Sequence, residues 1–227
     1  MSNVPTPTLA RRAAGEFLGT ALLLATVVGS GIMAEQLSGG NVALALLANT
    51  VATGAGLVAL ILTFGALSGA QFNPAVTLWA AAQRAFPWRD VPAYVVAQTA
   101  GAFAGVFAAH AMFGLPVLQV SHHVRSGPAQ WFSEAVATFG LLAVIAGCGR
   151  ARPTAVPFAV GAYITAAYWF TASTSFANPA VTLARTATST FAGIRPVDAP
   201  GFIVAQLAAA ALASVALRWL FTEESSS

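Results

Sequence analysis

Charge is the scarcest property of this 227-residue chain, because Asp, Glu, Lys and Arg together make up only 7% of it. A soluble domain carries roughly 25% charged residues. With 57% hydrophobic residues and a mean hydropathy of +0.75, the composition instead predicts a protein whose surroundings are lipid. Lysine is absent, and the ten basic residues are scattered arginines, so no basic patch suggests a nucleic-acid partner.

Cysteine is nearly absent as well, and Cys148 alone excludes an internal disulfide and a cysteine-based metal cluster. No Ser/His/Asp arrangement, carboxylate pair or Gly-rich phosphate loop suggests catalysis. We therefore predict no enzymatic activity, no cofactor and no metal site. The adjacent His122 and His123, with Arg125, are a weak metal signal, and exposure in a polar outer loop accounts for them.

Long hydrophobic runs are what the chain has in abundance, and six can cross a hydrocarbon layer, which takes about 20 helical residues. They are Ala13–Ala34, Val42–Phe64, Val91–Phe113, Trp131–Gly149, Thr154–Thr171 and Ala199–Leu220. The first is too long for the apolar core of a signal peptide, so we interpret it as a retained helix. Two further apolar pieces, Asn73–Gln83 and Asn178–Thr188, are long enough for only half a bilayer.

The two short pieces begin with the same hexapeptide, Asn-Pro-Ala-Val-Thr-Leu, at positions 73–78 and 178–183. Its two Asn-Pro-Ala triplets are Asn73-Pro74-Ala75 and Asn178-Pro179-Ala180. Asn can cap a first helical turn, and Pro at the first helical position gives up an N–H that would be unpaired anyway. Each triplet therefore predicts a helix start directly after an irregular loop.

The repeat extends further, because Glu16 and Glu134 occupy equivalent places in the two halves, as do Gln98 and Gln206. Each half, about 11–113 and 131–221, has three spans with a half-helix between its second and third. An odd number of spans places the halves in opposite orientations. We predict an all-α membrane protein, a single domain with six transmembrane helices and two re-entrant half-helices in an inverted repeat, with its site near the midplane.

Irregular backbone at membrane depth is tolerated where protein buries it or where it lines a water-filled path. Inversion brings the two half-helix N-termini together, and their partial positive charges repel cations. The Asn73 and Asn178 amides would donate hydrogen bonds to a solute, and free loop carbonyls would accept them. This arrangement favours a passive channel for small uncharged solutes.

The paired triplets, the Glu in the first span of each half and the stretch Ser-Gly-Ala-Gln-Phe-Asn-Pro-Ala-Val-Thr at 68–77 resemble the major intrinsic protein family, the aquaporins and aquaglyceroporins. The resemblance covers about residues 11–220. It implies a homotetramer in which every subunit has its own pore. It also implies that Glu16 and Glu134 buttress the loops by accepting their N–H groups. Gln98 and Gln206 are interpreted as interhelical hydrogen-bonding residues.

Members of that family narrow at four positions, which counting from the motifs places here at Thr53, Ala166, Ser175 and Val181. Val181 stands where most members have Arg, and this substitution resembles the bacterial branch of the family that is associated with arsenic handling. Four small, uncharged residues predict a wide opening. We therefore expect glycerol-like polyols, metalloid hydroxides such as arsenite, and water as solutes.

Two residue types leave alternatives open. Arg185, one helical turn beyond Val181, either replaces the missing arginine or snorkels at a helix end, and we favour snorkelling. Glu16 and Glu134 would also suit a proton-coupled secondary transporter, which is the alternative function, although a structural role is favoured.

The arginines predict the orientation, since seven of the ten fall on one side when both termini are cytoplasmic. We expect a multi-pass protein of the cell (inner or plasma) membrane. The terminal segments 1–9 and 222–227 are predicted to be disordered.

Overall fold

A computed structural model describes residues 7–221, and within that part the chain forms eight α-helices and no β-strand. In chain order they are α1 (Leu9–Leu37), α2 (Val42–Ser68), α3 (Pro74–Ala82), α4 (Val91–Met112), α5 (Pro128–Ala151), α6 (Val156–Phe170), α7 (Pro179–Ala184) and α8 (Ala199–Phe221). Three 3₁₀ turns accompany them, at Trp88–Asp90, Pro153–Ala155 and Arg185–Ala187. The predicted all-α membrane fold is confirmed.

The N-terminal helix begins earlier than predicted. Leu9 is already helical, because the Thr8 side chain accepts a hydrogen bond from the Arg11 N–H and so caps α1. The rest of the predicted disorder, at residues 1–6 and 222–227, lies outside the described residues.

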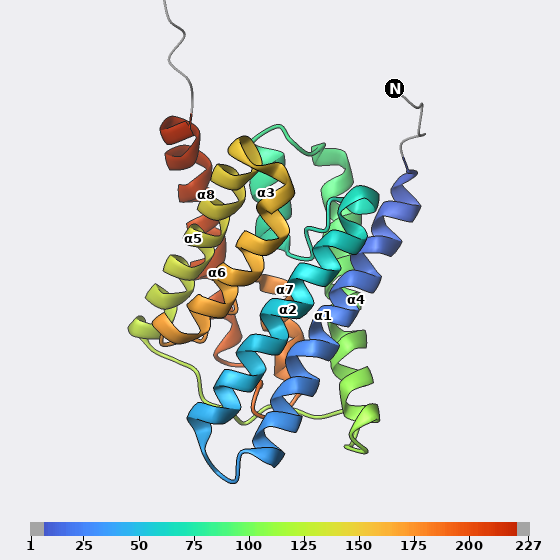
Figure 1. The fold of residues 1–227 in the computed structure, drawn as a ribbon, viewed down its shortest axis with the longest axis vertical. Coiled ribbons are helices and arrows are strands. Elements are labelled where there is room, and N and C mark those ends of the chain that lie inside the picture. Colours follow the sequence, from blue (N-terminus) through green and yellow to red (C-terminus); the bar gives the residue numbers. More distant parts are fainter. Residues whose placement is uncertain (1–6, 222–227) are drawn as a thin grey trace, which may run out of the picture.

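Five helices, α1, α2, α4, α5 and α8, are long and apolar enough to cross a membrane. The predicted fifth span is shorter than expected, because Pro153–Ala155 forms a 3₁₀ turn and α6 itself has 15 residues. The start of α1 and the end of α8 lie at the same end of the bundle (Figure 1). That placement requires an even number of crossings, and α6 supplies the sixth.

The two short helices have the predicted starts, each with Asn as its N-cap and Pro as its first residue. They occupy opposite halves of the bundle, with α3 in the upper half and α7 below it (Figure 1). α3 has nine residues, but α7 has only six and ends at Ala184, where the 3₁₀ turn follows. The second half-helix is therefore shorter than the predicted Asn178–Thr188.

Close packing of the long helices depends on glycine at the crossings. A Cβ built on Gly101 or Gly105 of α4 would lie 2.3 Å from the Phe17 carbonyl oxygen or 2.1 Å from the Ala21 carbonyl oxygen of α1. Backbone therefore touches backbone along this pair of helices, and α1 is held where it can carry Glu16 towards the centre.

Replacing Gly105 with alanine is expected to destabilise the protein, because the new Cβ would force α1 and α4 apart. Overpacking of this kind costs about 1–3 kcal/mol. The measurement is the thermal unfolding midpoint in detergent. Gly65→Ala in α2 is the matched control, since a Cβ there meets nothing within 4 Å. Equal midpoints for the two variants would contradict this account of the crossing.

Candidate functional site: a cavity between two loops

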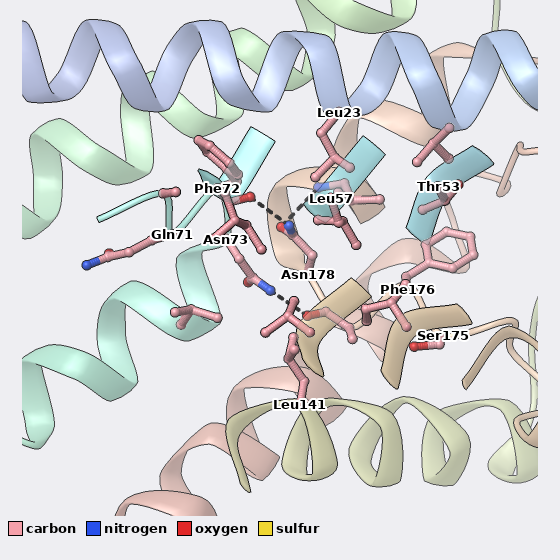
Figure 2. Close-up of a pocket in the computed structure, with 18 of the residues that line it drawn as sticks. Leu23, Thr53, Leu57, Gln71, Phe72, Asn73, Leu141, Ser175, Phe176 and Asn178 are labelled. Carbon is pink, nitrogen blue, oxygen red and sulfur yellow. Dashed lines mark hydrogen bonds between the residues drawn. The ribbon is translucent and has the colours of Figure 1, made fainter. Parts of the chain in front are cut away.

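A cavity of about 130 Å³ lies between the loops that lead into α3 and α7. Asn73 and Asn178 lie side by side near its middle, with Gln71 to one side and Thr53 and Ser175 to the other (Figure 2). We refer to its two ends as the Gln71 end and the Ser175 end. The remaining wall is largely aliphatic, with side chains of Leu23, Val27, Leu57, Ile61, Leu141, Ile145, Val156, Val160 and Ile164.

The two asparagines both cap their helices and tie the two loops together. Each amide oxygen accepts a hydrogen bond from the N–H two residues further on, at 2.9 and 3.0 Å. The Asn73 amide nitrogen donates to the Ala177 carbonyl at 2.7 Å, and the Asn178 amide nitrogen donates to the Phe72 carbonyl at 2.8 Å (Figure 2). An amide nitrogen carries two protons, so each asparagine keeps one for a solute oxygen.

Glu16 holds the first loop. Its carboxylate accepts hydrogen bonds from the backbone N–H groups of Gln71 (3.0 Å) and Phe72 (2.7 Å), from the Ser68 hydroxyl (2.6 Å) and from the Gln98 amide (2.8 Å). The side chain is fully buried. Because four donors converge on it, the carboxylate is fully engaged in fixing the backbone just before Asn73.

Glu134 holds the second loop in an equivalent way. It accepts hydrogen bonds from the N–H groups of Phe176 and Ala177, both at 2.8 Å, and from the Gln206 amide at 2.6 Å. Gln206 also donates to Thr182 of α7 at 2.9 Å. In each half, then, a glutamate on one long helix holds the loop. A glutamine on another long helix donates to that glutamate and to a threonine of the half-helix that follows.

The loop backbone is strained in a way that frees its carbonyls. In the two loops, left-handed φ values of 46° to 61° occur at five non-glycine residues, namely Ala70, Phe72, Thr174, Ser175 and Ala177. Such residues cost about 1–3 kcal/mol each and persist only where the surroundings hold them. Within residues 7–221 no hydrogen bond reaches the carbonyls of Ala70, Gln71, Ser175 or Phe176. These four residues line the cavity and can accept hydrogen bonds from a solute.

Thr53, Tyr168 and Ser175 line the Ser175 end, and Val181 also lines the cavity. The Tyr168 hydroxyl donates to the Thr53 hydroxyl at 3.4 Å. The Ser175 hydroxyl is buried without a hydrogen-bond partner among the described residues. Three of the four predicted constriction residues therefore line the cavity.

The fourth prediction, Ala166, is wrong. Ala166 is exposed on the outer surface of α6 and does not line the cavity, whereas Tyr168 does. Two residues turn a helix by about 200°, so a counting error of two moves a side chain from one face to the other. An aromatic side chain therefore lines the cavity where the sequence predicted a small residue.

Arg185 is not the snorkelling residue that the sequence favoured. Its side chain is buried, with 2% of the residue exposed, and it lines the cavity. The guanidinium carbon lies 3.4 Å from the centroid of the Phe176 ring, and Nε donates to the Ala192 carbonyl. The guanidinium group therefore lies at the Ser175 end of the cavity and does not extend to the outer surface of the protein.

Arg125 was missed as a site residue, because it lies in a polar loop where no periodicity marks it as buried. It is only 8% exposed. Its guanidinium donates to the carbonyls of Gly193 (2.8 Å) and Ser173 (3.3 Å), and its carbon lies 5.2 Å from the Phe176 ring centroid. The loop before α5 thus reaches in beside the second half-helix loop.

The histidines have ordinary structural surroundings. The buried His110 ring is hydrogen-bonded to the Val117 carbonyl and to the Thr188 hydroxyl, both at 2.8 Å. His122 and His123 are exposed. No group of three or more His, Cys, Asp or Glu side chains in residues 7–221 is arranged to hold a metal.

Comparison with known proteins gives a consistent result. A family model described as "Major intrinsic protein" matches residues 3–154. The chain is 60% identical to Aquaglyceroporin AqpS of Rhizobium meliloti (strain 1021) over 212 residues, which cover 93% of this chain and 91% of that protein. It is 33% identical to Aquaporin NIP3-1 of Oryza sativa subsp. japonica over 171 residues, or 71% of this chain and 54% of the relative. Among solved structures it resembles the X-ray structure of the aquaglyceroporin from Plasmodium falciparum, with a TM-score of 0.68, 25% identity, and coverage of 94% and 96%.

Proposed function

This chain belongs to the major intrinsic protein family, and on that premise we propose that it is a passive membrane channel for small uncharged solutes such as glycerol and water. The observation that carries the proposal is the pairing of spare donors and spare acceptors along one cavity. The asparagine amides supply the donors, and the loop carbonyls supply the acceptors. A neutral solute with hydroxyl groups can replace its hydrogen bonds to water with hydrogen bonds to these donors and acceptors as it enters the cavity.

The lining also argues against the alternative, a proton-coupled transporter. Coupling needs a titratable group on the path, and among the described residues that line the cavity there is no Asp, Glu or His. Glu16 and Glu134 do not line it, and they are occupied by the backbone N–H groups of the loops. Their paired positions favour a structural role.

We propose metalloid hydroxides, such as undissociated arsenite, as further solutes. As(OH)₃ is neutral and carries three hydroxyls, as glycerol does, so it can use the same donors and acceptors. Val181 supports this extension, because an uncharged side chain stands where relatives usually carry Arg. The test is uptake into liposomes of water, glycerol, urea and arsenite, compared with empty liposomes. Arsenite uptake no faster than in empty liposomes, with glycerol uptake clearly faster, would remove arsenite from the proposal.

We propose that both termini are cytoplasmic and that the protein resides in the cell (inner or plasma) membrane. Arg12, paired with Asp90 at 2.8 Å, and Arg218, which donates to the Ala82 carbonyl, place their charges at the end where α1 starts. Cytoplasmic segments of membrane proteins usually carry an excess of Lys and Arg, so we place this end of the bundle in the cytoplasm. Protease accessibility of tags at the two termini in sealed vesicles tests the orientation.

We also propose a homotetramer, with a complete cavity in each subunit. Large apolar side chains such as Leu47, Val96 and Phe132 are exposed on the long helices. These surfaces suit lipid or a second copy of the chain. The mass of the detergent-solubilised complex tests the assembly.

A further inference from the structure

Two buried arginines from distant parts of the chain share one aromatic ring. Arg125, in the loop before α5, and Arg185, at the end of α7, both have their guanidinium carbons within 5.2 Å of the Phe176 ring centroid. Phe176 and Arg185 both line the cavity at its Ser175 end. Two positive charges therefore lie close to one end of the cavity, Arg185 in its lining and Arg125 behind the Phe176 ring.

Neither guanidinium group forms a direct ion pair, although the buried Glu134 carboxylate attracts both from further away. Arg125 donates to carbonyl oxygens and to the Thr174 hydroxyl, none of which carries a negative charge. Asp198 accepts from the Arg125 backbone N–H, but its carboxylate forms its ion pair with Arg195, at 2.9 Å. No ion pair within residues 7–221 involves the side chain of Arg125 or of Arg185.

Arg185, which lines the cavity, also has donors that no other described group uses. Its Nε donates to the Ala192 carbonyl, but its two terminal nitrogens have no hydrogen-bond partner among the described residues. The Ser175 hydroxyl, one residue from Phe176, is likewise unpartnered. A charged group nine-tenths buried and unpaired is costly, which indicates that its charge has a use at this site.

We propose that Arg125 and Arg185 together form the cation barrier of this channel, in place of the arginine that Val181 replaces. Unpaired positive charge in a site shielded from water raises the free energy of a passing cation far more than it would in water. A neutral solute is not repelled, and it can accept hydrogen bonds from the terminal nitrogens of Arg185. The barrier presupposes the channel function proposed above.

Urea and guanidinium are the best pair of probes, because they have nearly the same planar shape and size while guanidinium keeps its positive charge at all ordinary pH values. In liposomes, the wild-type protein is expected to pass urea and glycerol and to exclude guanidinium. Arg185→Met, which keeps much of the bulk without the charge, is expected to raise guanidinium permeability at least about tenfold. Arg185→Lys, which retains the charge, is expected to keep guanidinium out.

Arg89→Met is the matched control, since Arg89 is an exposed arginine before α4, and its loss should not change guanidinium exclusion. Guanidinium exclusion by Arg185→Met equal to that of the wild type, with glycerol still passing, would overturn the proposal. A wild-type protein that passes neither glycerol nor urea would instead overturn the channel function itself.

A second pair of variants covers the case in which Arg185→Met fails to fold. Ser175→Asp adds a carboxylate one residue from Phe176, whose ring both guanidinium groups approach, and Asp tolerates the left-handed φ of 50° found there. We expect it to admit guanidinium. Ser175→Asn adds the same bulk without charge and should exclude guanidinium, whatever it does to glycerol flux. Equal guanidinium permeability for these two variants would contradict the barrier.

Discussion

Val181→Arg is expected to reduce glycerol permeability at least about tenfold, which corresponds to roughly 1.4 kcal/mol of additional barrier. Val181 is 6% exposed and lines the cavity. An arginine there would occupy space that the valine leaves open and would add a third guanidinium group near Arg125 and Arg185. Water is smaller than glycerol, so its permeability should fall less. Light-scattering measurements of liposome shrinkage in glycerol and in a non-permeant osmolyte give both values.

Val181→Ile is the control for this experiment, because it adds one methylene group without charge and should change glycerol permeability by no more than about twofold. If Val181→Arg conducted glycerol as fast as the wild type, Val181 would not belong to the constriction. Tyr168 and Thr53 would then have to set the width of the path.

Glu134→Gln is expected to lose most glycerol flux, at least about tenfold, and to lower the thermal unfolding midpoint. The carboxylate accepts hydrogen bonds from the N–H groups of Phe176 and Ala177. An amide has one acceptor oxygen, so one of these buried N–H groups would face an NH₂ group. An unsatisfied buried donor costs about 1–3 kcal/mol, and the loop it holds carries Asn178 and the carbonyls of the path.

Glu35→Gln is the matched control, since Glu35 is exposed near the end of α1 and its change should affect neither flux nor midpoint. Glycerol flux and an unfolding midpoint equal to those of the wild type in Glu134→Gln would contradict the structural role. A folded Glu134→Gln protein whose transport no longer depends on a proton gradient would instead favour the transporter.

Much of the architecture could be predicted because it is encoded locally. Asn followed by Pro specifies a helix start wherever it occurs, and the duplicated hexapeptide relates the two halves. The structure brings Asn73 and Asn178 together near the middle of the cavity, and it places Glu16 and Glu134 against the two loops. These features can be predicted from short segments of the sequence, without knowing the lengths of the loops that connect them.

The Ser175 end could not be predicted in the same way, because it depends on loop lengths and long-range contacts. Counting back from Asn178 assigned Ala166, yet the turn after Phe170 brings Tyr168 to the cavity. Arg125 approaches Phe176 from a loop about 50 residues earlier in the chain. Hydrophobic periodicity describes helix faces, and it does not report where a polar loop folds inward.

The central claim, passive conduction of a neutral solute, is tested most directly by the initial rate of glycerol entry into liposomes containing the wild-type protein. The rate should rise in proportion to the glycerol concentration, well above that of empty liposomes, and should be unchanged by a protonophore that collapses the proton gradient. A rate that saturates with glycerol concentration and falls to the empty-liposome value when the protonophore is added would contradict the account.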